Sequence, residues 1–351
     1  MVKFITYPSG NVWTSSIGEV EIQATGNSVA VEISAGEAIL FSNTYVPSSG
    51  QFVFYGLSGI LEAYMRDNSL VACSCSIKVT ASDGEATAEF KAFYCSRTMR
   101  HSVDSWAASR FLTVANYAVL APSSPLKLTA AVSDSDGKYL IRGVYEDESG
   151  EKIPFSKDID IAGIKQGELV CVAVDVSPSE VLSYIAAGQS EKRLLAYSVF
   201  AGKRSFSVFV DNTGRESMFT FLFRNMFNAE ETLRVCGVVD RNLAIERGEA
   251  VIGEKTIVYD VNATLSYGLT TAPMPRVEAA VIEQLQQSYD VRDIYGNALV
   301  VTDENYEYDT DMTTLKSVKL TWKYAADRVM DETDLPDNSG IFTKEFDNRF
   351  A

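Results

Sequence analysis

In Gly18-Glu-Val-Glu-Ile-Gln-Ala24, apolar and polar side chains alternate strictly, and Ser28-Val-Ala-Val-Glu-Ile-Ser34 repeats the alternation after a Gly26-Asn27 turn signal. Alternation places every second side chain on the same face of an extended chain, so each stretch predicts a β-strand with one buried face. The dipeptide between them favours a tight turn. These two stretches indicate a mainly β fold, and much of the remaining sequence shows the same alternation.

The alternating pattern continues through the first hundred residues. Residues 73–80 and 86–95 flank Ser82-Asp-Gly-Glu, and an Asp-Gly step between two alternating runs predicts a hairpin. Several short strands at this spacing are typical of a β-sandwich, which we expect for residues 1–96. Residues 59–66 depart from the pattern and favour a helix of one or two turns.

Residues 97–204 predict a second β-rich domain, which also contains a helix signal. Ser177 suits the N-cap of a helix and Pro178 suits its first helical position. Glu180, three residues after the cap, completes a capping box, and Gly188 favours termination of the helix.

Residues 205–330 predict a third β domain with one helix. Strands are expected at 206–210, 218–223, 232–239 and 255–267. The helix is expected at 275–288, where Val277, Val281 and Leu285 recur at intervals of four and so share one face. We expect that face to pack against the sheet of this domain.

The end of the chain, 331–351, predicts an extended acidic tail. It is too polar and too interrupted to pack as an element by itself, yet it carries four large apolar residues: Ile341, Phe342, Phe346 and Phe350. Burying each of them on a neighbouring molecule would contribute about 1.5–3 kcal/mol, so we expect them to form an interface as a tail arm. The sequence thus predicts a mainly β chain of tandem β-sandwich-like domains, with one or two short helices and an extended C-terminal tail.

The charge of the chain argues against some partners. Its 351 residues include 31 basic and 47 acidic ones, which gives a formal net charge of −16 and an isoelectric point of about 4.6. Nucleic acid and anionic membrane surfaces repel such a chain, and no cluster of Lys or Arg reverses the repulsion locally. The sequence has neither the apolar core of a signal peptide nor a run of the roughly 20 apolar residues that span a membrane. We therefore expect folding in a cytoplasm, without nucleic-acid binding or membrane insertion.

The sequence offers no specific catalytic, cofactor or metal constellation. His101 is the only histidine, and its neighbours Ser102 and Asp104 are too close in sequence for a triad, which is assembled from distant segments. Phosphate-loop, dinucleotide and zinc-protease motifs are absent, and the acidic stretch 303–311 lacks the glycine and terminal glutamate of a calcium-binding loop. The five cysteines lack the paired spacing of a zinc site, so we expect buried, reduced thiols. We predict a protein that is not an enzyme and has no catalytic, cofactor-binding or metal-binding residues.

An aromatic platform for a sugar is an alternative that the sequence leaves open. Trp106 lies in a polar, loop-like stretch and is the tryptophan best placed for exposure, so it is the candidate for a sugar contact. This interpretation would make the chain a carbohydrate-binding or adhesive β-sandwich protein whose partner is a host-surface glycan.

Three stretches in the last third of the chain resemble a known group of proteins. They are Phe219-Thr-Phe-Leu-Phe-Arg-Asn-Met-Phe-Asn-Ala-Glu-Glu-Thr232, Val261-Asn-Ala-Thr-Leu-Ser-Tyr-Gly-Leu-Thr-Thr-Ala-Pro-Met-Pro275, and Asn305-Tyr-Glu-Tyr-Asp-Thr-Asp followed by 315–324. In this order they resemble virion proteins encoded in the tail-gene regions of tailed phages and prophages. The resemblance implies a structural or adaptor subunit of a phage tail or related virion assembly, made in the host cytoplasm. Its partners would be copies of itself and other virion proteins.

Overall fold

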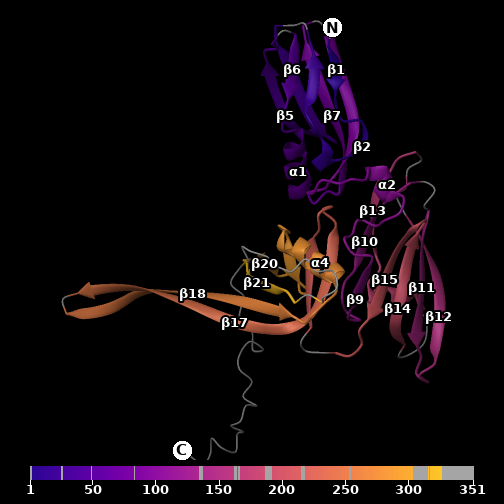
Figure 1. Ribbon diagram of the computed structural model, residues 1–351, viewed down its shortest axis with the longest axis vertical. Coiled ribbons are helices and arrows are strands. Elements are labelled where there is room, and N and C mark those ends of the chain that lie inside the picture. The colour runs from indigo at the N-terminus through magenta and orange to yellow at the C-terminus, as the bar shows by residue number, and fades with distance from the viewer. Residues whose placement is uncertain are drawn as a thin grey trace, which may run out of the picture.

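The computed structural model describes residues 2–302, 315 and 317–325, except for 25–26, 49, 83, 134–136, 162–163, 165–166, 186–191, 215–217 and 253. In this part of the chain, strands predominate and fall into three successive units (Figure 1). The mainly β fold predicted from alternation is therefore confirmed. The predicted tail arm with Ile341, Phe342, Phe346 and Phe350 lies outside the described residues.

The first unit consists of two sheets that share one apolar core. One sheet has the strand order β1 (Lys3–Thr6), β3 (Val20–Gln23), β6 (Gln51–Phe54). The other has the order β2 (Gly10–Trp13), β8 (Gly84–Phe93), β7 (Ala72–Ala81), β4 (Val29–Ala35), β5 (Ala38–Tyr45). Ile22 of β3 and Val31 and Ile33 of β4 are buried in the same core, so the alternating residues share a buried face as predicted.

Helix α1 (Leu57–Asp67) packs on this core at the end of the unit nearest the other two (Figure 1). Leu57, Leu61 and Met65 recur at intervals of four and are all fully buried, so the helix presents one apolar stripe to the core. The helix expected at 59–66 is therefore present and is longer than expected. A short 3₁₀ turn, Thr14–Ser16, follows β2.

The middle unit combines a five-stranded sheet with a two-stranded one. The larger sheet has the order β12 (Lys152–Asp160), β11 (Lys138–Glu146), β14 (Arg193–Ala201), β15 (Arg204–Val210), β9 (Tyr117–Leu120). The smaller sheet pairs β10 (Lys127–Val132) with β13 (Val170–Asp175). Helix α3 (Pro178–Ile185) begins at Pro178, where the capping signals predicted a helix start.

Two details of this region differ from the sequence-based expectation. The boundary expected at 204/205 cuts through the β14–β15 hairpin, because β15 pairs with β14 and so belongs to the middle sheet. Alternation at 206–210 indicated a strand but not its partner. The polar stretch 97–110 contains a short helix, α2 (Val103–Ala107), whose N-cap Ser102 accepts a hydrogen bond through Oγ from the backbone N–H of Ser105 at 3.2 Å.

The third unit is a closed barrel. Its strand order is β16 (Met218–Arg224), β17 (Glu230–Ile252), β18 (Lys255–Thr271), β21 (Lys319–Tyr324), β20 (Ala298–Val301), β19 (Val291–Asp293). The barrel closes because β16 pairs with β17 on one side and with β19 on the other.

Helix α4 (Arg276–Gln286) packs on the core of the barrel. Val281 and Leu285 are buried there as predicted, together with Ala279 and Ile282. Val277 is 43% exposed, so its predicted burial is wrong. On a helix of 3.6 residues per turn, positions at a strict interval of four rotate by about 40° per step. Val277, two such steps before Leu285, therefore lies about 80° around the helix from it, outside the buried face.

One apolar cluster joins the three units. Trp13 and Phe93 come from the first unit, Ala131 from the middle unit, and Phe227 from the turn between β16 and β17. Phe227 is fully buried, and its ring centroid lies 5.5 Å from that of Trp13. The units therefore share a core, which the sequence-based picture of tandem domains did not include.

The turn at Asn228 ties the barrel to the first unit. Asn228 has the positive φ of 59° that asparagine tolerates well. Its buried side-chain Nδ2 donates to the carbonyl oxygens of Met65 at 3.0 Å and Leu70 at 2.9 Å, and its Oδ1 accepts a hydrogen bond from the hydroxyl of Tyr289. These bonds satisfy a buried amide and fix the orientation of the turn that presents Phe227.

Candidate interaction surfaces

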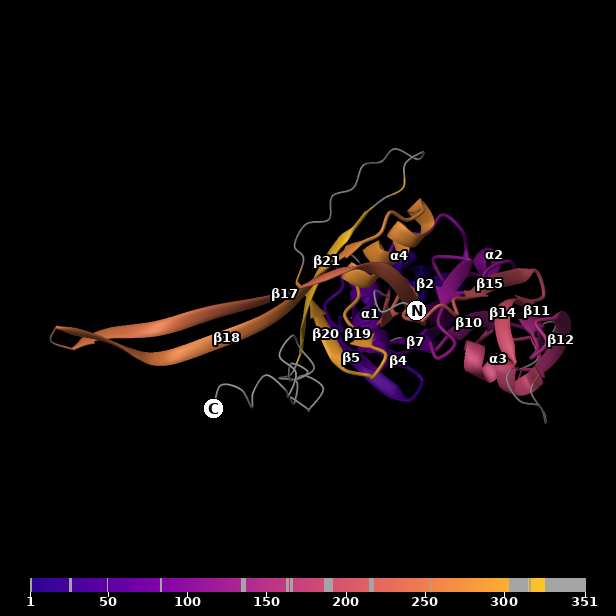
Figure 2. The ribbon, with the colours of Figure 1, turned by 90° about the horizontal axis from the view of Figure 1, so that it is seen from below.

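Strands β17 and β18 extend far beyond the barrel as a two-stranded arm (Figures 1 and 2). Their pairing runs from Gly237↔Thr271 to Ile252↔Lys255, whereas β21 pairs with β18 only between Tyr267 and Thr270. We call residues 241–252 and 255–266 the arm. Within the described part of the chain, no third strand pairs with the arm.

The two faces of the arm differ in chemistry. Residues directly opposite each other in an antiparallel pair lie on the same face. The register therefore defines an apolar face, made of the pairs Leu243↔Leu265, Ile245↔Ala263 and Arg247↔Val261. It also defines a polar face, made of the pairs Asn242↔Ser266, Ala244↔Thr264 and Glu246↔Asn262.

The apolar face is open to solvent. Leu243 is 55% exposed, Ile245 43% and Val261 57%. Nearer the barrel, the residues of the same parity are covered: Tyr267 packs against the barrel core and Leu269 is fully buried in it. The apolar face of the arm thus continues the core-facing side of the barrel strands outward, past the point where the barrel ends.

A two-stranded ribbon with an exposed apolar face is expected to be marginally stable by itself. An isolated two-stranded hairpin is marginally stable in water, and exposed strand edges favour pairing with other chains. Burying the three exposed side chains would contribute about 1.5–3 kcal/mol each. The arm therefore leaves both apolar side chains and strand edges exposed to solvent.

Charge is divided between the same two faces. Arg241 and Arg247 lie on the apolar face, on either side of Leu243 and Ile245, and Glu249 follows on the same face, opposite Val258. Asp240, Glu246 and Asp260 occupy positions on the opposite face. The whole chain carries a formal net charge of −16. The part of the apolar face around Leu243 and Ile245 is thus flanked by two arginines, although the chain as a whole is acidic.

Sequence reasoning predicted the β18 side of this arm but missed the β17 side, residues 241–252. The strand expected at 232–239 is the first part of β17, which runs on to Ile252, and the strand expected at 255–267 is part of β18. The signal for a strand was present, because the large apolar residues Leu243 and Ile245 alternate with Asn242, Ala244 and Glu246. Alternation alone, however, does not show whether an apolar face meets a core or solvent.

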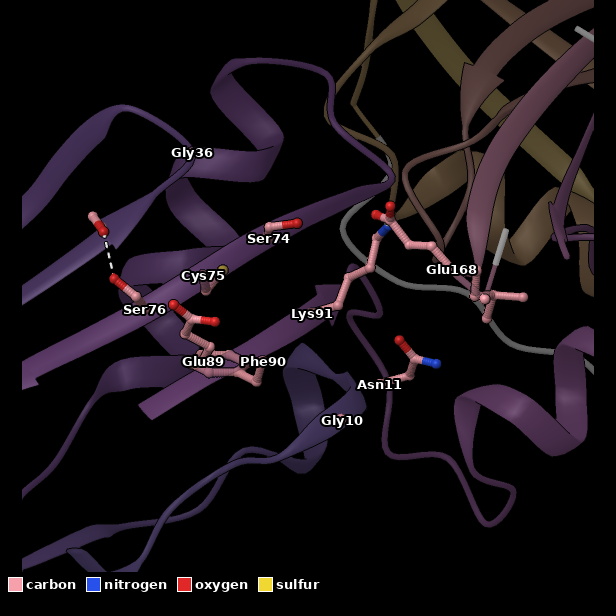
Figure 3. A pocket seen from close by; sticks show the side chains of 13 residues that line it. Gly10, Asn11, Gly36, Ser74, Cys75, Ser76, Glu89, Phe90, Lys91 and Glu168 are labelled. Carbon is pink, nitrogen blue, oxygen red and sulfur yellow. Dashed lines mark hydrogen bonds and ion pairs between the residues drawn. The ribbon is translucent and has the colours of Figure 1, made fainter. Parts of the chain in front are cut away.

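A second surface is a polar cleft between the first and middle units, with a volume of about 550 Å³ (Figure 3). Its floor is the outer face of β2, β8, β7 and β4. Two cross-strand rows of hydrogen-bonding side chains line it: Asn11, Lys91 and Ser74 form one, and Glu89, Ser76 and Ser34 form the other.

The cleft is bordered by side chains from the middle unit. Lys91 Nζ forms an ion pair with Glu168 Oε1 at 2.6 Å, directed from the floor toward the segment before β13 (Figure 3). Asn11 Nδ2 donates to Asp104 Oδ1 at 2.7 Å, and the hydroxyls of Ser34 and Ser76 are hydrogen-bonded at 2.8 Å. Hydroxyl, amide and carboxylate groups in this arrangement could hold a small polar ligand.

The sugar-contact candidate Trp106 lies outside this cleft, in α2. Its side chain is half-buried and packs on the apolar cluster that joins the three units, with its ring centroid 5.3 Å from that of Phe227. Its Nε1 donates to the carbonyl oxygen of Phe111 at 3.1 Å, and the guanidinium of Arg110 lies 5.0 Å from the ring centroid. The indole is therefore less exposed than the sequence suggested, and the sugar contact stays a prediction.

The cysteines are free thiols, and the burial expected for them holds for Cys75 and Cys95, whereas the other three are half-buried. Cys73 and Cys75 share the core-facing side of β7 with their sulfurs 3.4 Å apart. The hydrogen bond with Cys75 lowers the pKa of Cys73, and the nearby charge of Lys91 also lowers it, against the effect of burial. The same hydrogen bond, together with burial, raises the pKa of Cys75. Burial raises the pKa of Cys171 to about 12.

Among the described residues, no group of three or more His, Cys, Asp or Glu side chains is placed to hold a metal ion. None of the helices that the structure describes is long and apolar enough to cross a membrane.

Comparison with known proteins adds no family. No family model and no curated protein matches the chain. A chimeric titin Z1Z2-Z1Z2 tandem carrying a GRGDS peptide from fibronectin is 12% identical, covers 60% of this chain and 100% of its own, and has a TM-score of 0.17. The crystal structure of CBD12 from CALX1.2 is 11% identical, covers 54% of this chain and 75% of its own, and has a TM-score of 0.16. Similarities at these TM-scores carry no argument about the arrangement or function of this chain.

Proposed function

We propose that this chain is a structural or adaptor subunit of a phage tail or related virion assembly, made in the host cytoplasm, which acts through protein–protein interfaces rather than catalysis. The observation that carries the proposal is the arm, whose apolar face has no partner within the described chain. The three stretches that resemble virion tail-region proteins support it. Their described parts lie in the barrel and the arm, in β16 to β17, in β18 to α4 and in β21.

The partners proposed for the arm are copies of the same chain and other virion proteins. Arg241 and Arg247 on the apolar face favour an acidic partner surface, and a second copy of a chain with formal charge −16 provides one. A contact in which the arm of one copy meets a different surface on the next is heterologous. Contacts of that type generate rings or open filaments rather than isolated pairs.

The test replaces apolar side chains of the arm without changing its propensity to form strands. The double variant Leu243→Thr, Val261→Thr places β-branched residues, which favour strands, at both positions but adds hydroxyl groups to the apolar face. A loss of about 1.5–3 kcal/mol per side chain should weaken self-association by roughly a hundredfold or more. Light scattering and negative-stain images measure the assembled fraction.

The matched control makes the same kind of change on the polar face: Asn242→Thr with Asn262→Thr. It should assemble as the wild type does, and both variants should keep the wild-type melting temperature because the arm has no core of its own. Wild-type protein that stays monomeric at all concentrations, or equal assembly of both double variants, would refute self-assembly through this face.

The second candidate function is carbohydrate binding or adhesion, and the hydroxyl-lined cleft is the observation that favours it. Its test is calorimetric titration with maltotetraose, cellotetraose and N-acetylchitotetraose. Ser74→Ala with Ser76→Ala should abolish binding, whereas Ser42→Ala, on the exposed surface of β5, should not. If none of the three oligosaccharides binds the wild type, this candidate fails.

A further inference from the structure

The start of β17 buries a carboxyl group where the units meet. Glu231 is 6% exposed. Asn225 Nδ2 donates to Glu231 Oε2 at 2.8 Å and also to the carbonyl oxygen of Leu112 at 2.8 Å. The backbone N–H groups of Val114 and Ala115 lie close enough to the same carboxyl to lower its pKa. Glu231 and Asn225 therefore hold residues 112–115 against the barrel.

The segment 112–115 contacts the barrel just before the chain enters the sheet of the middle unit. Leu112 belongs to the apolar cluster that joins the three units, and Ala115 is buried in the barrel core. Strand β9 of the middle unit begins at Tyr117, directly after this segment. We call the contact between the middle unit and the barrel the seam. A change at Glu231 would therefore act on the seam.

A cavity of about 50 Å³ lies along the seam, lined by Tyr117 and Phe206 from the middle unit and by Glu231 and Glu278 from the barrel. The titratable and charged groups that face it from the neighbouring elements are paired with one another. Lys127 on β10 pairs with Glu230 at 3.3 Å, Arg234 on β17 pairs with Asp211 at 2.8 Å, and the Tyr117 hydroxyl donates to Glu278 on α4 at 3.0 Å.

We propose that Glu231 is a proton-linked latch on the seam: the protonated carboxyl keeps the middle unit and the barrel closed on each other, and its ionisation weakens their contact. The physical basis is the loss of hydration, because a carboxylate this deeply buried gives up its water and receives only neutral hydrogen-bond donors in exchange. This inference is independent of the proposed function and concerns how firmly the barrel is held.

The direction of the effect follows from two protonation equilibria. The ordinary pKa of a glutamate is 4.5, and burial raises that of Glu231 to about 7, against the lowering effect of the hydrogen bond from Asn225 and of the nearby N–H groups of Val114 and Ala115. Between these two pH values the folded chain holds a proton that the unfolded chain has lost. The stabilisation is therefore complete below about pH 4.5 and is lost as the pH rises through 7. The loss corresponds to a change on the order of a hundredfold in the unfolding equilibrium.

The experiment compares urea unfolding of the full chain at closely spaced pH values from 5 to 8.5 for the wild type, Glu231→Gln and Glu230→Gln. Glutamine cannot ionise, so Glu231→Gln should lose the part of the pH dependence that the wild type shows between pH 5 and 8. Glu230→Gln makes the same chemical change at the neighbouring, half-buried position and should keep that dependence. A constant offset for Glu231→Gln is expected, because its amide NH₂ faces the donor of Asn225.

Two results would overturn the latch. The first is a pH dependence of Glu231→Gln parallel to that of the wild type. The second, which needs no variant and so covers the case in which Glu231→Gln does not fold, is a direct titration of the wild-type carboxyl by ¹³C NMR with a midpoint below pH 5. Support requires a midpoint near neutral pH, with faster amide exchange of Val114 and Ala115 above it after correction for intrinsic rates.

Discussion

Replacing Phe227 by alanine removes the side chain on which all three units converge. Phe227 is fully buried, and its ring centroid lies 5.5 Å from that of Trp13 and 5.3 Å from that of Trp106. Truncation of a buried phenylalanine costs about 3–5 kcal/mol through lost transfer energy and the cavity left behind. The two lost aromatic contacts place the expected loss in the upper half of that range, at about 4–5 kcal/mol.

The assay is urea unfolding followed by both far-ultraviolet circular dichroism and tryptophan fluorescence, since two of the three tryptophans contact Phe227. If the cluster couples the units, both signals should shift together toward lower urea. The control is Phe209→Ala, at a position that is 52% exposed, which should change the free energy of unfolding by less than about 0.5 kcal/mol. A loss below about 1 kcal/mol for Phe227→Ala, or a shift of only one of two separate transitions, would refute a shared core.

Two further predictions concern α4 and the end of the chain. Leu285→Ala, at a fully buried position, should cost about 2–5 kcal/mol in urea unfolding, whereas Val277→Ala, at a 43% exposed position, should cost well under 1 kcal/mol; equal losses would contradict the orientation of the helix. Deleting the residues after Asp331 should leave the melting temperature unchanged but reduce self-association measured by light scattering, because Ile341, Phe342, Phe346 and Phe350 are removed; unchanged association would rule out a tail arm.

The candidate surfaces were predictable only in part. The apolar side chains of the arm were visible in the sequence, since Leu243 and Ile245 alternate with Asn242 and Ala244. Their meaning was not, because the same alternation in β4 produces the buried residues Val31 and Ile33. Whether an apolar face is covered depends on strands far away in the sequence.

The sequence by itself determined the mainly β class, the start of α3 at Pro178 and the position of α4, because these features depend on interactions between neighbouring residues. Alternation, capping and helical spacing act over a few residues, so they can be read from neighbouring positions. The tertiary structure alone decided that β15 pairs with β14, that Val277 is exposed and that Phe227 joins three units. It also decided that Glu231 is buried without a charged partner in its hydrogen bonds, whereas its neighbour Glu230 pairs with Lys127. These features depend on contacts between segments distant in sequence, and burial there is set by which surfaces meet rather than by the identity of the residue.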